Sequence, residues 1–151
     1  MSLERMYNSF LLNKVPDNWV DVGYPSLKPL SSWVSDYCVR MDFIRSWLEE
    51  GEPMSYWVPA FFFPQGFMTA VMQIYARRTQ IAIDTIVFKS TARNAERADI
   101  KQAPEIGVNI HGLFIQGAKW DWVKSYFIES EPGELFSRIP VIWLEPVLIQ
   151  N

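Results

Sequence analysis

The sequence contains only one cysteine and one histidine among its 151 residues, and this scarcity limits the chemistry that it can support. A lone Cys38 excludes a disulfide within the chain, so a reducing compartment is the simpler context. No neighbour in the sequence would activate Cys38 as a nucleophile, and we expect its side chain to be a small buried apolar group. One histidine and one cysteine do not make a zinc site, so the sequence predicts no metal site.

Blocks of basic residues and phosphate-binding loops are missing as well. The 14 basic and 17 acidic residues are interspersed and give a formal net charge of −3, which provides no electrostatic footprint for a nucleic-acid backbone. Neither G-x-x-x-x-G-K-[ST] nor G-x-G-x-x-G, the glycine-rich patterns that cradle phosphates, occurs in the sequence. We therefore expect no nucleic-acid partner and no cofactor bound by these residues.

The sequence is instead dense in aromatic residues, which make up 15% of it and include seven tryptophans. Its centre is an uncharged stretch from Pro53 to Ala76 that is long enough to cross a bilayer. Pro59 and Pro64 would each remove a backbone donor from a spanning helix, and the interspersed polar side chains would lie unsatisfied in lipid. We therefore predict no membrane span, and we divide the stretch into an extended segment, Tyr56 to Phe63, and a helix that begins near Pro64.

The sequence FFFPQGF at this division predicts a buried junction. The helix from Pro64 is apolar over most of its circumference, so we expect it to be buried on several sides, while Arg77 and Arg78 complement the dipole at its end. We also expect Phe62 to be buried, so that Phe62→Asp would unfold the chain. The full set of packing candidates is Phe61, Phe62, Phe63, Pro64, Gly66, Phe67, His111, Gly112, Trp120 and Trp143.

Two further helices are predicted before this stretch. A short one covers Leu3 to Leu12, and a longer one covers residues 31–51, where large apolar residues recur at intervals of three and four. Ser31 or Ser32 is positioned to cap the longer helix, and Gly51 followed by Pro53 marks its end.

After residue 80 the pattern changes to short runs rich in β-branched residues. They predict strands at 81–90, 107–117 and 138–149, with a bulge or tight bend at Gly112, where the apolar face of the second run switches. The segment at about 91–105 has mixed charge and no aromatic residue, which is typical of a mobile loop. The order of elements predicts an α+β fold in one compact unit, with a helical part at 1–80 and an antiparallel sheet or small β-barrel at 81–151.

His111 is the residue with the most catalytic potential, and the sequence favours a structural role for it. A lone histidine on a strand, between Ile110 and Gly112, is more often structural than catalytic. One alternative is a hydrolase in which His111 acts with Asp121 or a nearby glutamate, which needs a nucleophile beside the imidazole. Another is a stand-alone β-barrel module that binds a sugar or a small apolar ligand, which needs the rings of Trp120 and Trp122 on one concave surface.

Eight segments, spread from about Leu11 to Val147, carry a family resemblance. They read LLNKVPDNW, YPSLKPLSSWVSD, FIRSWLEEGEP, FFFPQGFMTAVMQIYARR, IDTIVF, GVNIHGLFIQGAKWD, ES and IPVIWLEPV. In this order they resemble the C-terminal region of dynein heavy chains. The FFFPQGF form is more similar to axonemal heavy chains than to the cytoplasmic one.

The resemblance implies a non-catalytic segment of a microtubule-based, ATP-driven motor. In this family the region follows a ring of six AAA+ modules, packs against one face of that ring, and consists of helices leading into a small antiparallel β-barrel. ATP and Mg bind elsewhere in the heavy chain and microtubules bind a distant stalk tip. The implied direct partner is therefore the AAA+ ring of the same heavy chain, and microtubules and other dynein subunits are reached only through the full-length protein.

The resemblance further implies that the segment tunes motor output and lies in the cytoplasm and cytoskeleton, in the axoneme of a cilium or flagellum. The sequence departs from the family at its end, because dynein heavy chains continue past the match to IPVIWLEPV with further strands whereas this sequence stops at Asn151. We therefore expect an open barrel, incomplete at the C-terminus, whose unpaired sheet edge promotes self-association.

Overall fold

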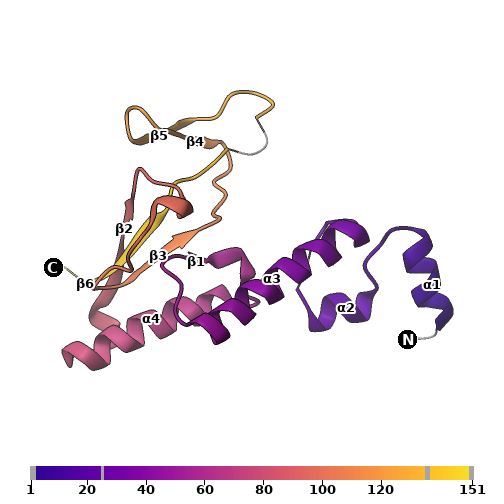
Figure 1. The fold of residues 1–151 in the computed structure, drawn as a ribbon, viewed down its shortest axis with the longest axis horizontal. Coiled ribbons are helices and arrows are strands. Elements are labelled where there is room, and N and C mark those ends of the chain that lie inside the picture. The colour runs from indigo at the N-terminus through magenta and orange to yellow at the C-terminus, as the bar shows by residue number, and fades with distance from the viewer. Residues whose placement is uncertain (1–2, 25, 135–136, 150–151) are drawn as a thin grey trace. The chain divides into compact units, whose positions relative to one another are not determined.

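The computed structural model describes residues 3–24, 26–134 and 137–149 (Figure 1). The chain divides into two compact units, Met1–Gly51 and Glu52–Asn151. This division falls at Gly51 rather than at residue 80, because the helix α4 (Pro64–Thr79) packs against the strands β2 (Ile86–Ala92) and β6 (Ile142–Leu148) of the second unit. The expected helical part, 1–80, thus contributes to both units.

The first unit is helical and consists of α1 (Leu3–Leu11), α2 (Asp17–Val22) and α3 (Leu30–Glu50). The helices predicted at 3–12 and 31–51 are confirmed to within one residue at each end. The short helix α2 was missed, although Pro16 before it and Gly23 after it are typical helix boundaries.

The start of α3 differs from the prediction. Neither Ser31 nor Ser32 caps it, because the helix begins one residue earlier, directly after Pro29. Asn13 takes over the capping role from a distance: its backbone oxygen accepts the N–H of Leu30 at 2.9 Å, and its side-chain Oδ1 accepts the N–H of Ser31 at 3.3 Å. The predicted end is confirmed, since Gly51 has a φ of 94° that favours glycine and donates its N–H to Trp47.

Stacked aromatic rings form the core of the first unit. Trp33 lies between Tyr24 and Tyr37, with both pairs of ring centroids 5.3 Å apart and nearly parallel. Trp19 lies 6.1 Å from Trp33. Among the described residues of this unit, the large apolar side chains that are buried are those of Tyr24 and Trp33.

The second unit contains α4 and two small sheets. One sheet has the order β1-β3-β6-β2, with β1 (Tyr56–Trp57) and β3 (Val108–His111) beside the strands already named, and the other pairs β4 (Ala118–Asp121) with β5 (Tyr126–Glu129). The predicted α+β fold is confirmed, and the strands that the structure describes do not close into a barrel. The larger sheet is mixed rather than antiparallel, because β1 runs parallel to β3.

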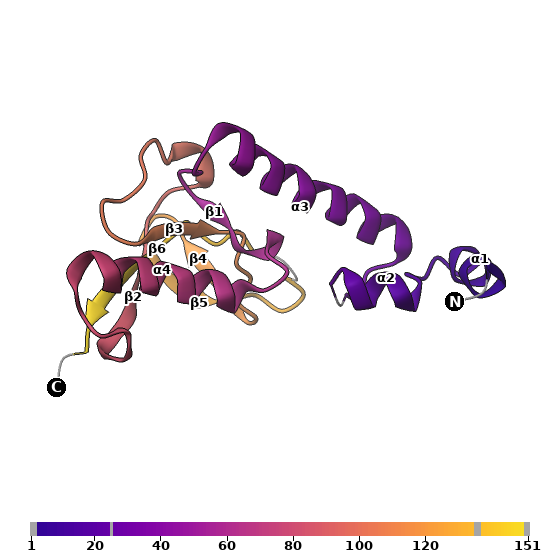
Figure 2. The same cartoon turned by 90° about the horizontal axis from the view of Figure 1, so that it is seen from below.

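The central strand β6 organises the core of this unit. It pairs with β2 along its whole length, from Ile86 opposite Leu148 to Ala92 opposite Ile142, and with β3 from Val108 to Ile110. Ile142 and Leu144, two residues apart on β6, lie on the same face of the strand, and both are buried. Figure 2 shows α4 in front of these strands, and the residue of α4 that is buried is Val71.

Burial of α4 on several sides, expected from its sequence, is wrong. Val71 is buried, whereas Ile74 on the flank of the helix is exposed. One stripe of the helix therefore meets the sheet, as in an ordinary amphipathic helix. The start of the helix at Pro64 is confirmed.

Several element boundaries after Gly51 differ from the prediction. The segment predicted to be extended, 56–63, contains only the two-residue β1 before a 3₁₀ turn at Val58–Ala60. The strand predicted at 81–90 begins at Ile86, after a 3₁₀ turn, and continues to Ala92. The strand predicted at 107–117 stops at His111, and Gly112 follows with a φ of 82°; the bulge or tight bend expected at Gly112 stays a prediction.

The segment expected to be a mobile loop carries regular contacts at its start. Residues 91 and 92 belong to β2, and beyond them Arg93 donates its N–H to Val141 while Val141 donates its N–H to Ala95. A 3₁₀ turn follows at Arg97–Asp99, with Glu96 and Asp99 capping each other's backbone. The mobility of 91–105 stays a prediction.

Candidate functional site

The three phenylalanines before α4 lie in different environments. Phe61 stacks on Phe67 with ring centroids 4.5 Å apart, and Phe67 lies 4.8 Å from Tyr56. Phe62 and Phe63 are exposed over 44% and 68% of their surface. The expectation that Phe62 is buried is therefore wrong, because only Phe61 of the three reaches the core.

The turn into α4 fixes the position of Phe63. Pro64 occupies the first turn of the helix, where its missing N–H is not needed. The ring of Phe63 lies against Gly66, since a Cβ built on Gly66 would be only 2.5 Å from Cδ1 of Phe63. The sequence FFFPQGF thus presents an exposed phenylalanine at a defined place.

His111 has a serine beside it, so the hydrolase alternative depends on the geometry of the pair. The hydroxyl Oγ of Ser55 lies 2.9 Å from Nδ1 of His111, and Ser55 is only 3% exposed. Burial, followed by the charge of Arg97, lowers the pKa of His111 to about 4. The carboxylate of Asp121 instead accepts the backbone N–H groups of Val123 and Lys124 at 2.9 Å.

This geometry suits a structural hydrogen bond that holds β1 beside β3 better than it suits a catalytic pair. A serine nucleophile has to reach its substrate, and the Ser55 hydroxyl lies in the interior. An orienting carboxylate is also needed on the imidazole, and Asp121 is engaged within its own turn. The bond joins the residue before β1 to the last residue of β3.

Trp120 and Trp143 serve packing within the second unit. Trp120 is 7% exposed and donates its indole N–H to Asn94 at 2.8 Å, and Trp143 donates its indole N–H to the backbone oxygen of Ile106 at 2.8 Å. A buried Trp120 cannot line an open concave surface together with Trp122. Gly112 also has a packing role, because a Cβ there would be 2.4 Å from Cδ1 of Trp57.

Cys38 corrects another expectation, because it is exposed on α3 rather than buried. Among the residues that the structure describes, no three His, Cys, Asp or Glu side chains are grouped closely enough to hold a metal ion. Within the same described part of the chain, no helix is long and apolar enough to cross a membrane.

The first unit contains a charged cluster that was not predicted from the sequence. Asp36 accepts hydrogen bonds from the Tyr24 hydroxyl at 2.5 Å, from Lys28 at 2.9 Å and from Arg40 at 2.8 Å. Burial alone would raise the pKa of Asp36, but these hydrogen bonds outweigh it and hold that pKa well below its usual range. Burial and the bond to Asp36 raise the pKa of Tyr24 to about 12. The spacing of Asp36 and Arg40, four residues apart on a helix, was a signal for part of this cluster.

One face of α1 carries exposed apolar side chains. Leu3, Tyr7 and Leu11 are exposed over 85%, 62% and 66% of their surface, and helical spacing places them on one side with Met6 and Phe10. None of the residues Leu3–Leu11, all of which the structure describes, is buried. Glu4, Arg5, Asn8 and Ser9 occupy the opposite side.

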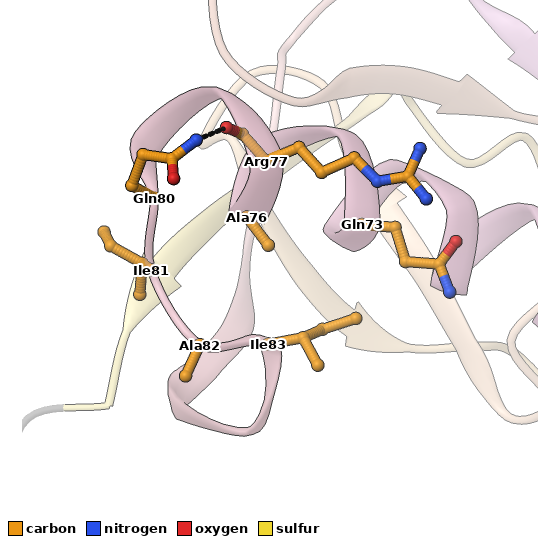
Figure 3. Close-up of a pocket in the computed structure, with 7 residues that line it drawn as sticks. All are labelled: Gln73, Ala76, Arg77, Gln80, Ile81, Ala82 and Ile83. Carbon is orange, nitrogen blue, oxygen red and sulfur yellow. Dashed lines mark hydrogen bonds between the residues drawn. The ribbon is translucent and has the colours of Figure 1, made fainter.

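A hollow of about 520 Å³ lies where the end of α4 meets the segment that leads to β2. Figure 3 shows its lining, which consists of Gln73, Ala76, Arg77, Gln80, Ile81, Ala82 and Ile83. No motif marks this site, and from the sequence Arg77 was expected only to complement the helix dipole.

Comparison with known proteins identifies the relatives of this chain. The family model for the C-terminal domain of the dynein heavy chain matches residues 1–151. The chain is 44% identical to dynein axonemal heavy chain 1 of Mus musculus over 97% of its length, and 45% identical to the same protein of Homo sapiens over 95% of its length. It is 39% identical to dynein axonemal heavy chain 6 of Homo sapiens, again over 95% of its length.

These relatives are much longer than this chain. The matched residues span 3% of both heavy chain 1 proteins and 4% of heavy chain 6. The predicted likeness to axonemal heavy chains is confirmed.

Proposed function

The chain belongs to the family of C-terminal domains of dynein heavy chains, and from this premise we propose that it is a non-catalytic segment of an axonemal dynein heavy chain that packs on the AAA+ ring of the same heavy chain and tunes its motor activity. The setting is a dynein assembly in the cytoskeleton of a cilium or flagellum. Microtubules and other dynein subunits are reached only through the full-length protein, and ATP and Mg bind elsewhere in it. These residues themselves carry no phosphate-cradling sequence.

The observation that carries this proposal is the apolar face of α1, where Phe10 packs against Trp19 with ring centroids 5.6 Å apart while Leu3, Tyr7 and Leu11 stay exposed. A helix of nine residues is too short to be stable in water by itself, so its stability has to come from packing of an apolar face. The exposed side chains of Leu3, Tyr7 and Leu11 are available for such packing. Contiguous exposed apolar surface of this kind marks a protein interaction site.

The partner that we propose is part of the same polypeptide. Because the matched residues amount to only 3% of the heavy chain 1 relatives, a large body of protein is available to cover α1 without a second molecule. Phe63, exposed before α4 in the second unit, offers a further apolar contact of the same kind.

Binding in trans tests the proposal. The AAA+ ring of an axonemal heavy chain is expressed without its C-terminal segment and mixed with the 151-residue chain, and co-elution and ATPase rate are measured. We expect the chain to co-elute with the ring and to change its ATPase rate, and to hydrolyse no ATP alone. Failure of the parent chain to bind contradicts the packing part of the proposal, and ATP hydrolysis by the chain alone contradicts the non-catalytic part.

A matched pair of α1 variants locates the contact. Tyr7→Asp combined with Leu11→Asp places charge on the apolar face and is expected to abolish co-elution. Asn8→Asp combined with Ser9→Asp adds the same two negative charges to the opposite side of the same helix and is expected to leave co-elution unchanged. Equal binding by both double variants would show that α1 is not the contact.

A further inference from the structure

The hollow at the end of α4 contains a cation, Arg77, that has no partner among the described residues. The side chain of Arg77 forms no ion pair, hydrogen bond or ring contact with any residue that the structure describes. Figure 3 shows this side chain extended along the hollow beside Gln73. A guanidinium presents several N–H donors in a planar fork that matches a carboxylate. Arg77 is therefore free to receive an anion.

A second residue of the hollow has an unfavourable backbone conformation. Gln80 ends α4 with a φ of 58° and a ψ of 36°, in the left-handed region that glycine adopts more easily. Its side-chain nitrogen Nε2 donates to the backbone oxygen of Arg77 at 2.8 Å, which holds the amide at the rim (Figure 3). This conformation ends the helix in the usual way, with the N–H groups of Gln80 and Ile81 both donated to the backbone oxygen of Ala76, and it fixes the position of Gln80 at the hollow.

The remaining wall of the hollow is apolar. Ile81, Ala82 and Ile83 follow Gln80 and line the side opposite Arg77 in Figure 3, and Ile83 is exposed. The hollow thus combines a charged donor and amide groups on α4 with an aliphatic wall. We propose that it binds an acidic segment of a protein partner, whose carboxylate meets Arg77 and whose neighbouring aliphatic side chain packs against Ile81 and Ile83.

The dipole of α4 opposes an anion at this end but does not prevent its binding. The last carbonyls of the helix are already occupied, because Ala76 accepts the N–H groups of Gln80 and Ile81 and Arg77 accepts the Gln80 amide. The dipole contributes roughly half a negative charge at the helix end, less than the full positive charge of Arg77. Charge complementarity therefore favours an acidic partner.

Peptide binding measured by fluorescence anisotropy tests this proposal. The probe is a short labelled peptide that carries two glutamates between leucines, and the control probe replaces both glutamates with glutamine. We expect the 151-residue chain to bind the glutamate peptide about tenfold more tightly, the effect of losing one charge-assisted bidentate pair. Equal affinity for the two peptides overturns the proposal.

Variants of the hollow separate its parts. Arg77→Gln is expected to weaken binding of the glutamate peptide about tenfold, and Arg77→Lys by less, because a lysine keeps the charge and loses the fork. Ile83→Ser is expected to weaken both peptides equally. Both positions lie at the surface, so circular dichroism of these variants should match the parent.

The matched control neutralises two cations elsewhere in the second unit. Arg97→Gln with Lys101→Gln changes the net charge by more than Arg77→Gln does, outside the hollow. Its affinity for the glutamate peptide is expected to equal that of the parent. If this control loses as much affinity for the glutamate peptide as Arg77→Gln does, the loss comes from the overall charge of the chain. That result would overturn the proposed binding site. Co-elution of Arg77→Gln with the AAA+ ring is measured as well. This variant leaves α1 unchanged, so it is expected to co-elute as the parent does, and a failure of the hollow to bind peptide is then distinguishable from a failure of the packing proposed for α1.

Discussion

Ser55 and His111 lie 56 positions apart in the sequence, yet Oγ of the serine is 2.9 Å from Nδ1 of the histidine. The bond secures a very short strand, because β1 pairs with β3 only at Tyr56 and Trp57. Beside it, the side-chain amide of Asn109 donates to the backbone oxygen of Met54 at 3.1 Å. Two side-chain bonds to β3 therefore replace the backbone pairing that β1 lacks.

The free energy of unfolding is expected to fall as the pH falls from 6.5 to 4. Burial lowers the pKa of His111 from 6.5 to about 4, so the unfolded chain binds a proton before the folded chain does. The stability that neutral His111 contributes is complete above pH 6.5 and is lost as the pH falls toward 4. The loss is about 3 kcal/mol at most. Urea unfolding at both pH values measures it.

His111→Gln is the control for this pH dependence. Glutamine does not titrate, and its amide is able to bond the Ser55 hydroxyl, so the drop between pH 6.5 and pH 4 is expected to shrink. A drop as large as in the parent would assign the pH dependence to other groups.

Asp36→Asn is expected to destabilise the first unit. The substitution removes the charge that Tyr24, Lys28 and Arg40 share, and a broken network of part-buried hydrogen bonds costs about 1–3 kcal/mol. Thermal unfolding monitored by tryptophan fluorescence measures the change, because Trp33 stacks on Tyr24. Asp42→Asn, which breaks an exposed pair with Arg45, is expected to cost less than about 0.5 kcal/mol.

The same variant has a spectroscopic readout. The pKa of Tyr24 is raised to about 12 by burial and by Asp36, so ultraviolet titration of Asp36→Asn is expected to show ionisation of one tyrosine at lower pH than in the parent. An unchanged titration would show that Asp36 does not control Tyr24.

The helices α1, α3 and α4 and the strands β2, β3 and β6 were predictable from the sequence because they follow local rules, whereas α2, β4 and β5 were not predicted. The periodicity of α3, the glycine at its end and the proline at the start of α4 each act within a few residues. The strand β6 was likewise found from its β-branched residues, although it begins at Ile142 rather than at 138. Errors of boundary arose where a 3₁₀ turn replaced the expected extended backbone, as before β2.

The sites were less predictable because their partners are distant in the sequence. Ser55 gave no local sign that it would meet His111, and Asn13 gave none that it would cap α3. Phe62 and Ile74 were expected inside because their neighbours are apolar, but apolar composition does not say which face meets the sheet. The helix dipole was already a sufficient local explanation for Arg77, so nothing in the sequence indicated the hollow beside it.

Phe61 and Phe62 are expected to respond differently to the same substitution. Phe61→Ala removes a ring that stacks on Phe67 and is expected to cost about 2–4 kcal/mol. Phe62→Ala changes a partly exposed ring and is expected to cost about 1 kcal/mol. Urea unfolding of the two variants measures both values. A larger loss for Phe62 would restore the buried position that its sequence suggested.

Gly112 and Gly117 separate two costs of a glycine substitution. Both have a positive φ, 82° and 76°, so alanine at either position is expected to lose about 1 kcal/mol to backbone strain. At Gly112 the added Cβ would also be 2.4 Å from Trp57, whereas at Gly117 nothing lies within 4 Å. We expect Gly112→Ala to have the lower melting temperature by several degrees. Equal melting temperatures would show that the Trp57 ring moves aside without cost.

The outer edge of β2 is expected to promote self-association of the chain. β2 is the last strand in its sheet order and pairs only with β6 among the described strands, so one of its edges offers backbone groups to another strand. Val87→Lys places a charge at an exposed position of this strand and is expected to lower the concentration-dependent mass measured by light scattering. Val39→Lys adds the same charge to an exposed position of α3 and should leave the mass unchanged. A parent chain that remains monomeric at high concentration would rule out this edge as a contact. If Val87→Lys and Val39→Lys lower the measured mass equally, the decrease comes from the change in net charge and not from the edge of β2.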